Sequence, residues 1–271
     1  MNDSLLEIHD VSCGYGKRQI VKNVSFTLHR GDVICLLGPN GVGKTTLFKA
    51  ILGFLKITEG KITVQGKDIS HTDRKALAKL VAFVPQIHRP VFPFRVLDMV
   101  LMGRTAHVET LGMPAKRDSE IAMAMLEQLH IVDLYDKPYT EISGGQQQMV
   151  LIARALAQEA QVLIMDEPTA SLDYGNQVKV LEQINALAVQ GLGVIMTTHF
   201  PDHAFLCATK TALMYQDGQF EIGGVENIVT EKKLGEAYGI RVKITHACGG
   251  NGDWVSGCIP LLNKQEPLLA I

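Results

Sequence analysis

The chain of 271 residues has no apolar run that approaches the length of a membrane-spanning helix, which needs about eighteen or more such residues. It has little excess charge, since 26 basic and 28 acidic side chains give a formal net charge of −2. This balance argues against a general nucleic-acid-binding surface. The first seven residues, MNDSLLE, lack the basic flank and long apolar core of a secretory signal, so no such signal is expected.

Cysteine is also sparse. The five cysteines form no C-x-x-C pair, and an odd number without an export signal favours reduced thiols in a reducing compartment. A metal site made from His246, Cys248 and Cys258 is conceivable, but the spacing matches no zinc pattern. The favoured interpretation of residues 246–271 is therefore a C-terminal extension that is flexible or packs in a dimer.

The most informative feature that is present is a phosphate-binding pattern, G-x-x-x-x-G-K-[ST]. It comprises Gly38, Pro39, Asn40, Gly41, Val42, Gly43, Lys44 and Thr45, and Thr46 follows. An apolar run, Val33–Leu37, precedes it and a helical stretch follows, and this context argues against an incidental glycine turn. Glycines let backbone N–H groups converge on phosphate oxygens, and a helix N-terminus adds partial positive charge. Because Lys44 can reach the phosphates and Thr45 can hold Mg²⁺, the segment predicts nucleoside triphosphate binding.

A pair of acids predicts that the nucleotide is also hydrolysed. Val162–Met165 reads as a strand buried on both faces, and it delivers Asp166 and Glu167 at its carboxyl end, where ligands sit in open α/β sheets. One carboxylate can support Mg²⁺ and the other can polarise an attacking water. Taken alone, the pair could be a strand that ends in solvated acids; beside a phosphate loop, hydrolysis is the better interpretation.

A third motif places serine and glycine amides at a helix start. It consists of Ser143, Gly144, Gly145 and Gln146, and a helical stretch follows it to Gln158. First-turn N–H groups have no intrahelical partners and form a second candidate anion site. An ordinary helix cap and turn is the alternative when this motif is considered by itself.

With these three motifs in this order, the chain resembles the ATP-binding cassette (ABC) subunits of transporters from Leu5 to about Ile244. The family signature Leu-Ser-Gly-Gly-Gln has its counterpart at residues 142–146, where Ile142 replaces leucine. Gln147 and Gln148 stand where relatives often carry charged side chains, so a contact at this helix is expected to differ. Neither departure touches the phosphate chemistry.

The resemblance also assigns four single residues, each of which has an ordinary explanation on its own. It implies that Tyr15 stacks on adenine, that Gln86 senses Mg²⁺, that Asp173 lies in the loop crossing between two cassettes, and that His199 is the switch histidine near the γ-phosphate. Alone, these residues would be a packing or turn aromatic, a solvated strand end, a helix N-cap and a hydrogen-bonded structural histidine. Their order along the chain favours the functional assignments. The resulting expectations are catalysis by Glu167, His199 and Gln86, with Mg²⁺ at Thr45, Gln86 and Asp166.

The fold expected from these features is an α/β P-loop NTPase core with a mixed sheet, an antiparallel β edge subdomain and an inserted helical subdomain. Apolar runs predict strands, and they are Leu5–Val11, Val24–Leu28, Val33–Leu37, Lys61–Val64, Leu80–Val84, Val162–Met165, Val194–Thr198, Thr211–Tyr215 and Gln219–Ile222. Between them the apolar spacing becomes helical. The expected ATPase domain is 1–245, with the core at 1–88 and 159–245, a helical insertion at 89–158, and the extension at 246–271.

The resemblance further implies a function. Residues 93–104 resemble the corresponding stretch in importers of iron–siderophore complexes, haem and cobalamin, some relatives of which carry oxyanions; a generic amphipathic helix is the alternative. The implied protein is a peripheral ATPase subunit at the cytoplasmic face of the cell membrane. It would work as a homodimer on two separate permease subunits, with a separate solute-binding protein, ATP and Mg²⁺, and no nucleic acid. Residues 86–104 are the expected permease-docking segment.

Other classes of cassette remain as alternatives. An exporter subunit is the nearest, because nothing in the ATPase motifs excludes it. A nucleic-acid-processing cassette would need a coiled-coil or zinc insertion, and the insertion here has neither heptads nor cysteine pairs. A non-hydrolysing regulatory cassette would lack the acidic base, whereas Glu167 is present.

Overall fold

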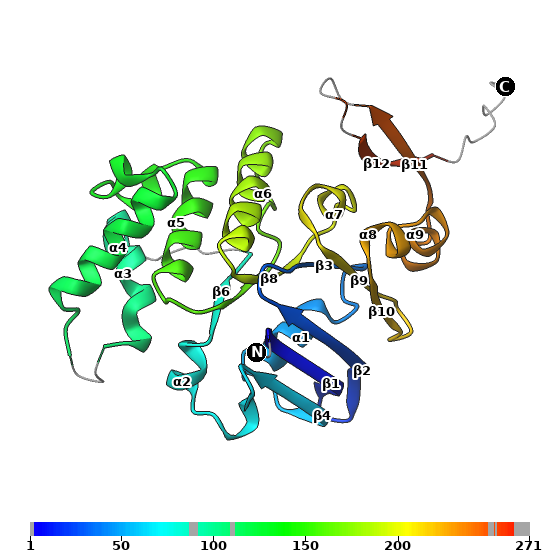
Figure 1. The fold of residues 1–271 in the computed structure, drawn as a ribbon, viewed down its shortest axis with the longest axis horizontal. Coiled ribbons are helices and arrows are strands. Elements are labelled where there is room, and N and C mark those ends of the chain that lie inside the picture. The colour runs from blue at the N-terminus through cyan, green and yellow to red at the C-terminus, as the bar shows by residue number, and fades with distance from the viewer. Residues whose placement is uncertain (1–2, 87–91, 109–111, 249–251, 253, 263–271) are drawn as a thin grey trace, which may run out of the picture.

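The computed structural model describes residues 3–86, 92–108, 112–248, 252 and 254–262. A six-stranded sheet forms the centre of the molecule (Figure 1). Two of its strands come from the first 84 residues, and the other four lie between residues 162 and 223. Its strands, in spatial order, are β10 (Phe220–Gly223), β9 (Lys210–Met214), β3 (Val33–Leu37), β8 (Gly193–Thr197), β7 (Val162–Met165) and β6 (Val81–Val84). All neighbours pair in parallel except β10 and β9, so the sheet is mixed, as predicted.

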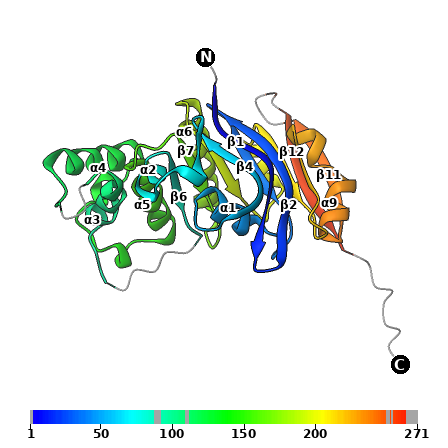
Figure 2. The same cartoon turned by 90° about the horizontal axis from the view of Figure 1, so that it is seen from below.

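A second, antiparallel sheet lies along one side of the first. Its order is β2 (Arg18–His29), β1 (Ser4–Tyr15), β4 (Ile57–Val64) and β5 (Lys67–Asp68). Strands β1, β2 and β4 appear together in Figure 2, with α1 (Lys44–Ile51) beside them. This sheet confirms the predicted antiparallel subdomain.

The central sheet is buried on both faces, which explains its uninterrupted apolar strands. Along β3, Val33, Cys35 and Leu37 point into one hydrophobic core, while Ile34 and Leu36 point into another. The second core also contains the inner residues of the antiparallel sheet and of α1. The first core holds the opposite face of the sheet against the helices that follow.

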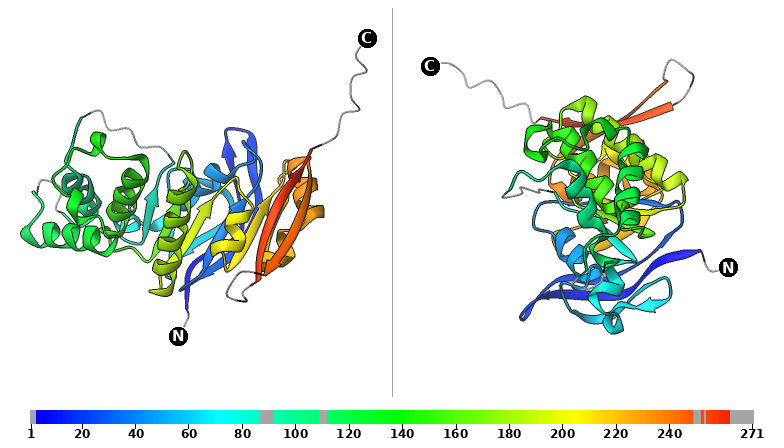
Figure 3. Two further views of the ribbon diagram at one scale, coloured as in Figure 1. Left: turned by 90° about the horizontal axis from the view of Figure 1, so that it is seen from above. Right: turned by 90° about the vertical axis from the view of Figure 1, so that its left-hand side faces the viewer.

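Those helices include the predicted helical insertion, which lies at one end of the molecule (Figures 1 and 3). Its elements are α3 (Val96–Leu101), η2 (Met102–Ala106), α4 (Lys116–Gln128), η3 (Val132–Leu134), η4 (Tyr139–Glu141) and α5 (Gly144–Leu156). Arg104 is buried here and binds Asp118 at 2.9 Å and Glu159 at 2.6 Å, which ties η2 to the start of α4 and to the segment that follows α5.

The remaining helices connect the strands or follow them: η1 (Ile69–His71), α2 (Arg74–Ala78), α6 (Tyr174–Val189), α7 (Asp202–Cys207), α8 (Val225–Ile228) and α9 (Glu231–Tyr238). In the part of the chain that is described, no helix combines the length and apolar character that crossing a membrane requires.

The chain continues after α9 into a hairpin of β11 (Arg241–Cys248) and β12 (Trp254–Leu261), at the end opposite the helical insertion (Figure 3). The sequence analysis predicted no strand here. Asp202 accepts a hydrogen bond from the Cys258 N–H at 2.6 Å, and Glu231 pairs with Lys243 at 3.0 Å, so the hairpin is held to α7 and α9. The described residues contain no group of three or more His, Cys, Asp and Glu side chains that could hold a metal ion.

Candidate nucleotide-binding and hydrolysis site

The candidate site gathers at one edge of the central sheet. The strands β3, β8, β7 and β6 are neighbours and run in parallel, so their carboxyl ends meet at the same edge. The phosphate loop follows β3, His199 follows β8, Asp166 and Glu167 follow β7, and Gln86 follows β6. The fold therefore brings together residues that are more than a hundred positions apart, at the place where open α/β sheets bind ligands.

The phosphate loop depends on glycine at three positions. Gly38, Gly41 and Gly43 have φ values of 143°, 77° and 122°, a region that other residues rarely adopt. A Cβ atom at Gly38 would also lie 2.6 Å from the backbone oxygen of Met214. Gly43 is the N-cap of α1, so the loop ends where unpaired helix N–H groups begin. Unpaired N–H groups that follow a glycine-rich loop are typical of an anion-binding site.

Lys44 lies across the loop. Its Nζ donates hydrogen bonds to the backbone oxygens of Gly38 at 2.6 Å and Pro39 at 3.0 Å. Burial lowers the pKa of Lys44, and the nearby Glu167 and Asp166 carboxylates oppose that effect. The ammonium group is thus held between the loop and the two acids, where phosphate oxygens can replace the backbone carbonyls as its partners.

Asp166 is fixed by two hydroxyl groups. Thr45 Oγ1 donates to one carboxylate oxygen at 3.2 Å, and Thr197 Oγ1 donates to the other at 2.7 Å. Thr45 is the second residue of α1, so the hydroxyl and the carboxylate meet beside the phosphate loop. Two hard oxygen donors this close form part of the ligand set that Mg²⁺ prefers.

Glu167 is held between the other two predicted side chains. Its Oε2 accepts a hydrogen bond from Gln86 Nε2 at 2.6 Å, and its Oε1 contacts His199 Nε2. The backbone of Glu167 has a φ of 50°, an uncommon value for a residue with a side chain. The carboxylate is consequently held in one orientation by its two neighbours and its backbone.

Thr197 was not predicted as a site residue, although the structure puts it at the centre of the acidic pair. Its hydroxyl donates to Asp166 and accepts the backbone N–H of Glu167 at 2.8 Å, and the residue is fully buried. The signal available in the sequence was a hydroxyl residue at the end of a buried strand that neighbours the acidic strand.

Tyr238 was also not predicted as a site residue. Its hydroxyl accepts a hydrogen bond from the N–H of Gly38 at 2.9 Å, although the two residues are 200 positions apart.

We expect Thr197→Val to reduce the turnover number for ATP by about tenfold to a hundredfold, because it releases both acids from their shared hydroxyl. ATP affinity should change much less, since no predicted phosphate contact is removed. Steady-state hydrolysis and equilibrium ATP binding separate the two effects, and Thr197→Ser, which keeps the hydroxyl, is the matched control. Unchanged turnover in the valine variant would contradict this account.

Tyr15 lies near the phosphate loop without lining it. The ring is 48% exposed, and Lys49 of α1 both donates to its hydroxyl at 3.3 Å and lies 5.8 Å from the ring centre. An exposed aromatic face beside the helix that follows the phosphate loop is accessible to a flat base. The adenine-stacking role stays a prediction.

The signature residues belong to a different part of the molecule. Ser143 caps α5 and forms a reciprocal capping box with Gln146. A Cβ at Gly145 would lie 2.6 Å from the Asn176 side chain, which Asp173 binds at the start of α6. Within the described ranges, no hydrogen bond or ion pair joins residues 143–146 to the phosphate loop. Among the described residues, the two anion sites of one chain are therefore not bonded to one another.

Part of the predicted docking segment can be located. Met102 and Gly103 lie in η2, and Phe92 and Phe94 are exposed, 64% and 37% respectively. Positions 87–91, which include His88, Arg89, Pro90 and Val91, lie outside the described residues.

Comparison with known proteins agrees with this geometry. The family model described as ABC transporter matches residues 21–170. The molybdate import ATP-binding protein MolC of Haemophilus influenzae is 38% identical over 79% of this chain and 80% of its own length. A probable iron chelatin transport ATP-binding protein of Helicobacter pylori is 34% identical over 86% and 92%. A solved chain from a transporter described as metal-chelate type, in an inward-facing conformation, superposes with a TM-score of 0.86 at 33% identity, covering 96% and 98%.

Proposed function

This chain belongs to the ABC transporter family and is an ATP-hydrolysing subunit of a transporter, and from that premise we propose that it powers the import of a metal chelate or a related solute. ATPases of this kind act on transmembrane permease subunits. The observation that supports hydrolysis best is the convergence of Lys44, Asp166 and Glu167 at one sheet edge. Sequence similarity to metal-chelate and iron-chelate transport proteins supports the choice of solute.

Each site residue has its own role in the proposed hydrolysis of ATP. Gly38–Thr46 bind the phosphates, and Lys44 supplies positive charge to the β- and γ-phosphates. Glu167 acts as the base that orients and deprotonates the attacking water, while Gln86 and His199 hold its two oxygens. His199 is the proposed switch histidine near the γ-phosphate, and its contact with Glu167 couples it to the base.

Mg²⁺ is the proposed metal cofactor, and Thr45, Asp166 and Gln86 are its proposed neighbours. The fit rests on the 3.2 Å approach of the Thr45 hydroxyl to the Asp166 carboxylate. When bound, Mg²⁺ would offset the negative charge of the phosphate oxygens during transfer. Gln86 would contact the metal through its side-chain oxygen, while its amide N–H donates to Glu167 at 2.6 Å.

The active assembly is a homodimer in which each ATP lies between Gly38–Thr46 of one chain and Ser143–Gln146 of the other. The lack of any hydrogen bond or ion pair between these two segments among the described residues is consistent with this arrangement. Tyr15 stacks on adenine, and Asp173 lies in the loop that crosses between the cassettes. The dimer is peripheral to the cytoplasmic face of the membrane and works with two permease subunits and a separate solute-binding protein.

Transport by the reconstituted complex tests the function. We expect proteoliposomes that contain this chain, its permease and its binding protein to accumulate a radioactive ferric chelate when ATP is supplied to this subunit. Lys44→Ala should abolish accumulation, because it removes a charged phosphate contact. Accumulation of molybdate but not of chelates would identify an oxyanion importer, and ATP-driven movement in the opposite direction would identify an exporter.

A further inference from the structure

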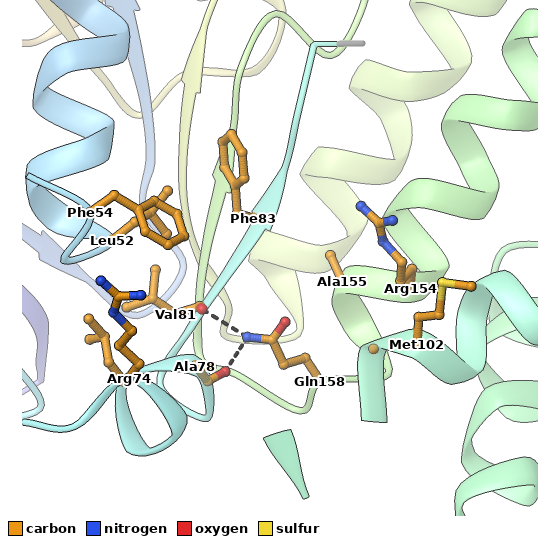
Figure 4. Close-up of a pocket in the computed structure, with 12 residues that line it drawn as sticks. Leu52, Phe54, Arg74, Ala78, Val81, Phe83, Met102, Arg154, Ala155 and Gln158 are labelled. Atoms are coloured by element: carbon orange, nitrogen blue, oxygen red, sulfur yellow. Dashed lines mark hydrogen bonds between the residues drawn. The ribbon is translucent and has the colours of Figure 1, made fainter. Parts of the chain in front are cut away.

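Two hollows lie toward opposite ends of the molecule. One, of about 370 Å³, is at the junction between the core and the helical insertion, and Phe83, Met102 and Arg154 are among its lining residues (Figure 4). The other, of about 210 Å³, lies between α7, α9 and the hairpin of β11 and β12. His199 and Tyr238 both line this second cavity, and both contact the proposed ATP site. The C-terminal hairpin thus lies beside two residues that are bonded to the nucleotide-binding machinery.

Tyr238 holds the first residue of the phosphate loop. Its hydroxyl accepts a hydrogen bond from the Gly38 N–H at 2.9 Å, while the Gly38 carbonyl oxygen accepts one from Lys44 Nζ at 2.6 Å. Gly38 is therefore bonded to a side chain through each of its two backbone groups. When phosphate oxygens take Lys44 away from the Gly38 carbonyl, the bond to Tyr238 can stay in place and keep the entry to the loop fixed.

The phenol suits this position chemically. Burial raises the pKa of Tyr238 to about 12, so the hydroxyl stays protonated and neutral at physiological pH. A neutral hydroxyl oxygen can accept the backbone N–H without placing a negative charge beside the phosphates. Gly38 is itself buried, and a buried N–H that loses its acceptor destabilises the conformation that exposes it to that loss.

The hairpin determines where α9 places Tyr238. Tyr238 is the last residue of α9, and Gly239 ends the helix with a φ of 68°, so the chain turns at once toward β11. At the other end of the helix, Glu231 accepts a hydrogen bond from the Ile244 N–H at 3.1 Å and pairs with Lys243 at 3.0 Å. Strand β11 is thus joined to the end of α9 through the chain and to its start through Glu231.

The second strand of the hairpin is bonded to the segment that follows the switch histidine. Asp202, the first residue of α7, lies three positions after His199 and accepts the Cys258 N–H at 2.6 Å. A two-stranded hairpin is marginally stable by itself, so these contacts with α7 and α9 hold it in place. The hairpin consequently bridges the helix that carries Tyr238 and the helix that follows His199.

We propose that Tyr238 is a positioning residue for the phosphate loop and that the C-terminal hairpin sets its place, so that the hairpin controls the affinity for ATP. This inference rests on the proposed ATP site and adds to it a residue and an element outside the nucleotide-binding motifs. A displaced hairpin turns α9 and withdraws the hydroxyl from Gly38, which disfavours the loop conformation that binds phosphate. The effect falls on binding rather than on the chemical step, because Glu167 keeps its contacts with Gln86 and His199.

Nucleotide binding and hydrolysis by the purified full-length chain test the role of Tyr238. We expect Tyr238→Phe to weaken the binding of a non-hydrolysable ATP analogue by about threefold to tenfold, the scale of one hydrogen bond. The turnover number at saturating ATP should change by less than about twofold. Tyr215→Phe is the matched control, since it removes a tyrosine hydroxyl that donates to Glu221 at 2.9 Å, and it should leave the affinity unchanged. A lower melting temperature or turnover number for Tyr238→Phe with unchanged affinity would show a merely structural role and overturn the proposal.

A double-mutant cycle tests whether the hairpin acts through this hydroxyl. Glu231→Ala removes both bonds between the start of α9 and β11, and we expect it to weaken analogue binding by about twofold to fivefold. In the Tyr238→Phe background the same change should have no further effect, because the two changes break one linkage. Glu236→Ala is the control on the same helix, since Glu236 pairs with Lys232 within α9.

The outcomes of the cycle are distinct. Additive losses in the double variant, or unchanged affinity in Glu231→Ala, would overturn the control of Tyr238 by the hairpin. Failure of the wild-type chain to bind the analogue would instead overturn the proposed ATP site on which this inference rests.

Discussion

Replacement of Glu167 by glutamine is expected to slow ATP hydrolysis by about a hundredfold or more while ATP binding is kept, the scale expected for a lost general base. Glutamine has nearly the shape of glutamate, and it can still meet Gln86 and His199, the two partners of the native carboxylate. It cannot take a proton from the attacking water. The chain should therefore bind ATP, close, and remain closed, because the step that releases the dimer is blocked.

Two measurements check this expectation. Hydrolysis is followed as phosphate release under saturating ATP, and the closed state is followed by gel filtration in the presence of ATP, where a dimer should accumulate. Glu159→Gln is a suitable control, because Glu159 pairs with Arg104 away from the sheet edge. Near-normal turnover by Glu167→Gln would show that Glu167 is not the general base.

The central strands were predictable because each is a short apolar run buried on both faces. Val33–Leu37 and Val162–Met165 were predicted with the bounds that the structure gives to β3 and β7. The strand expected at Leu5–Val11 extends to Tyr15 as β1, because its pairing with β2 and β4 continues through several register shifts. Such irregular pairing allows polar residues into the strand and hides it from a periodicity argument.

The hairpin of β11 and β12 had no comparable signal. Its strands carry exposed side chains along most of their length, and the segment between them is rich in glycine. What holds it are contacts with residues distant in the sequence, above all Asp202 to the backbone of Cys258 and Glu231 to Lys243. Interactions of this kind follow from the tertiary fold, and no local sequence pattern predicts them.

The candidate site also contains some residues with a local sequence signal and others that only the tertiary fold brings into place. Lys44, Asp166 and Glu167 were identifiable because their spacing and strand context serve a known chemistry. Thr197 and Tyr238 act through the hydroxyls they present to Asp166 and Gly38, and only the sheet order and the docking of α9 create those pairs. The sequence therefore predicted the groups that are expected to touch the nucleotide better than the groups that position them.

Because each proposed ATP site is shared between two chains, mixing two inactive variants is expected to restore ATPase activity. A homodimer of Lys44→Ala chains should lose about a hundredfold or more of its ATPase activity, since each site lacks a charged phosphate contact. The ATPase activity of a homodimer of Ser143→Arg chains should fall by a similar factor. The bulky side chain would fill the start of α5, where the phosphate would approach. Mixing the two chains should nevertheless recover activity.

The recovery follows from symmetry. In a heterodimer, one site combines both defects, while the other combines the intact phosphate loop of the Ser143→Arg chain with the intact signature of the Lys44→Ala chain. Random assortment of equal amounts makes half the dimers heterodimers, each with one of two sites intact, so independent sites predict about a quarter of wild-type activity. Differently tagged chains allow the heterodimer to be isolated and assayed. A heterodimer that is isolated at saturating ATP and stays as inactive as its parents would show that each site is built within a single chain, because only then do both chains carry a complete defect.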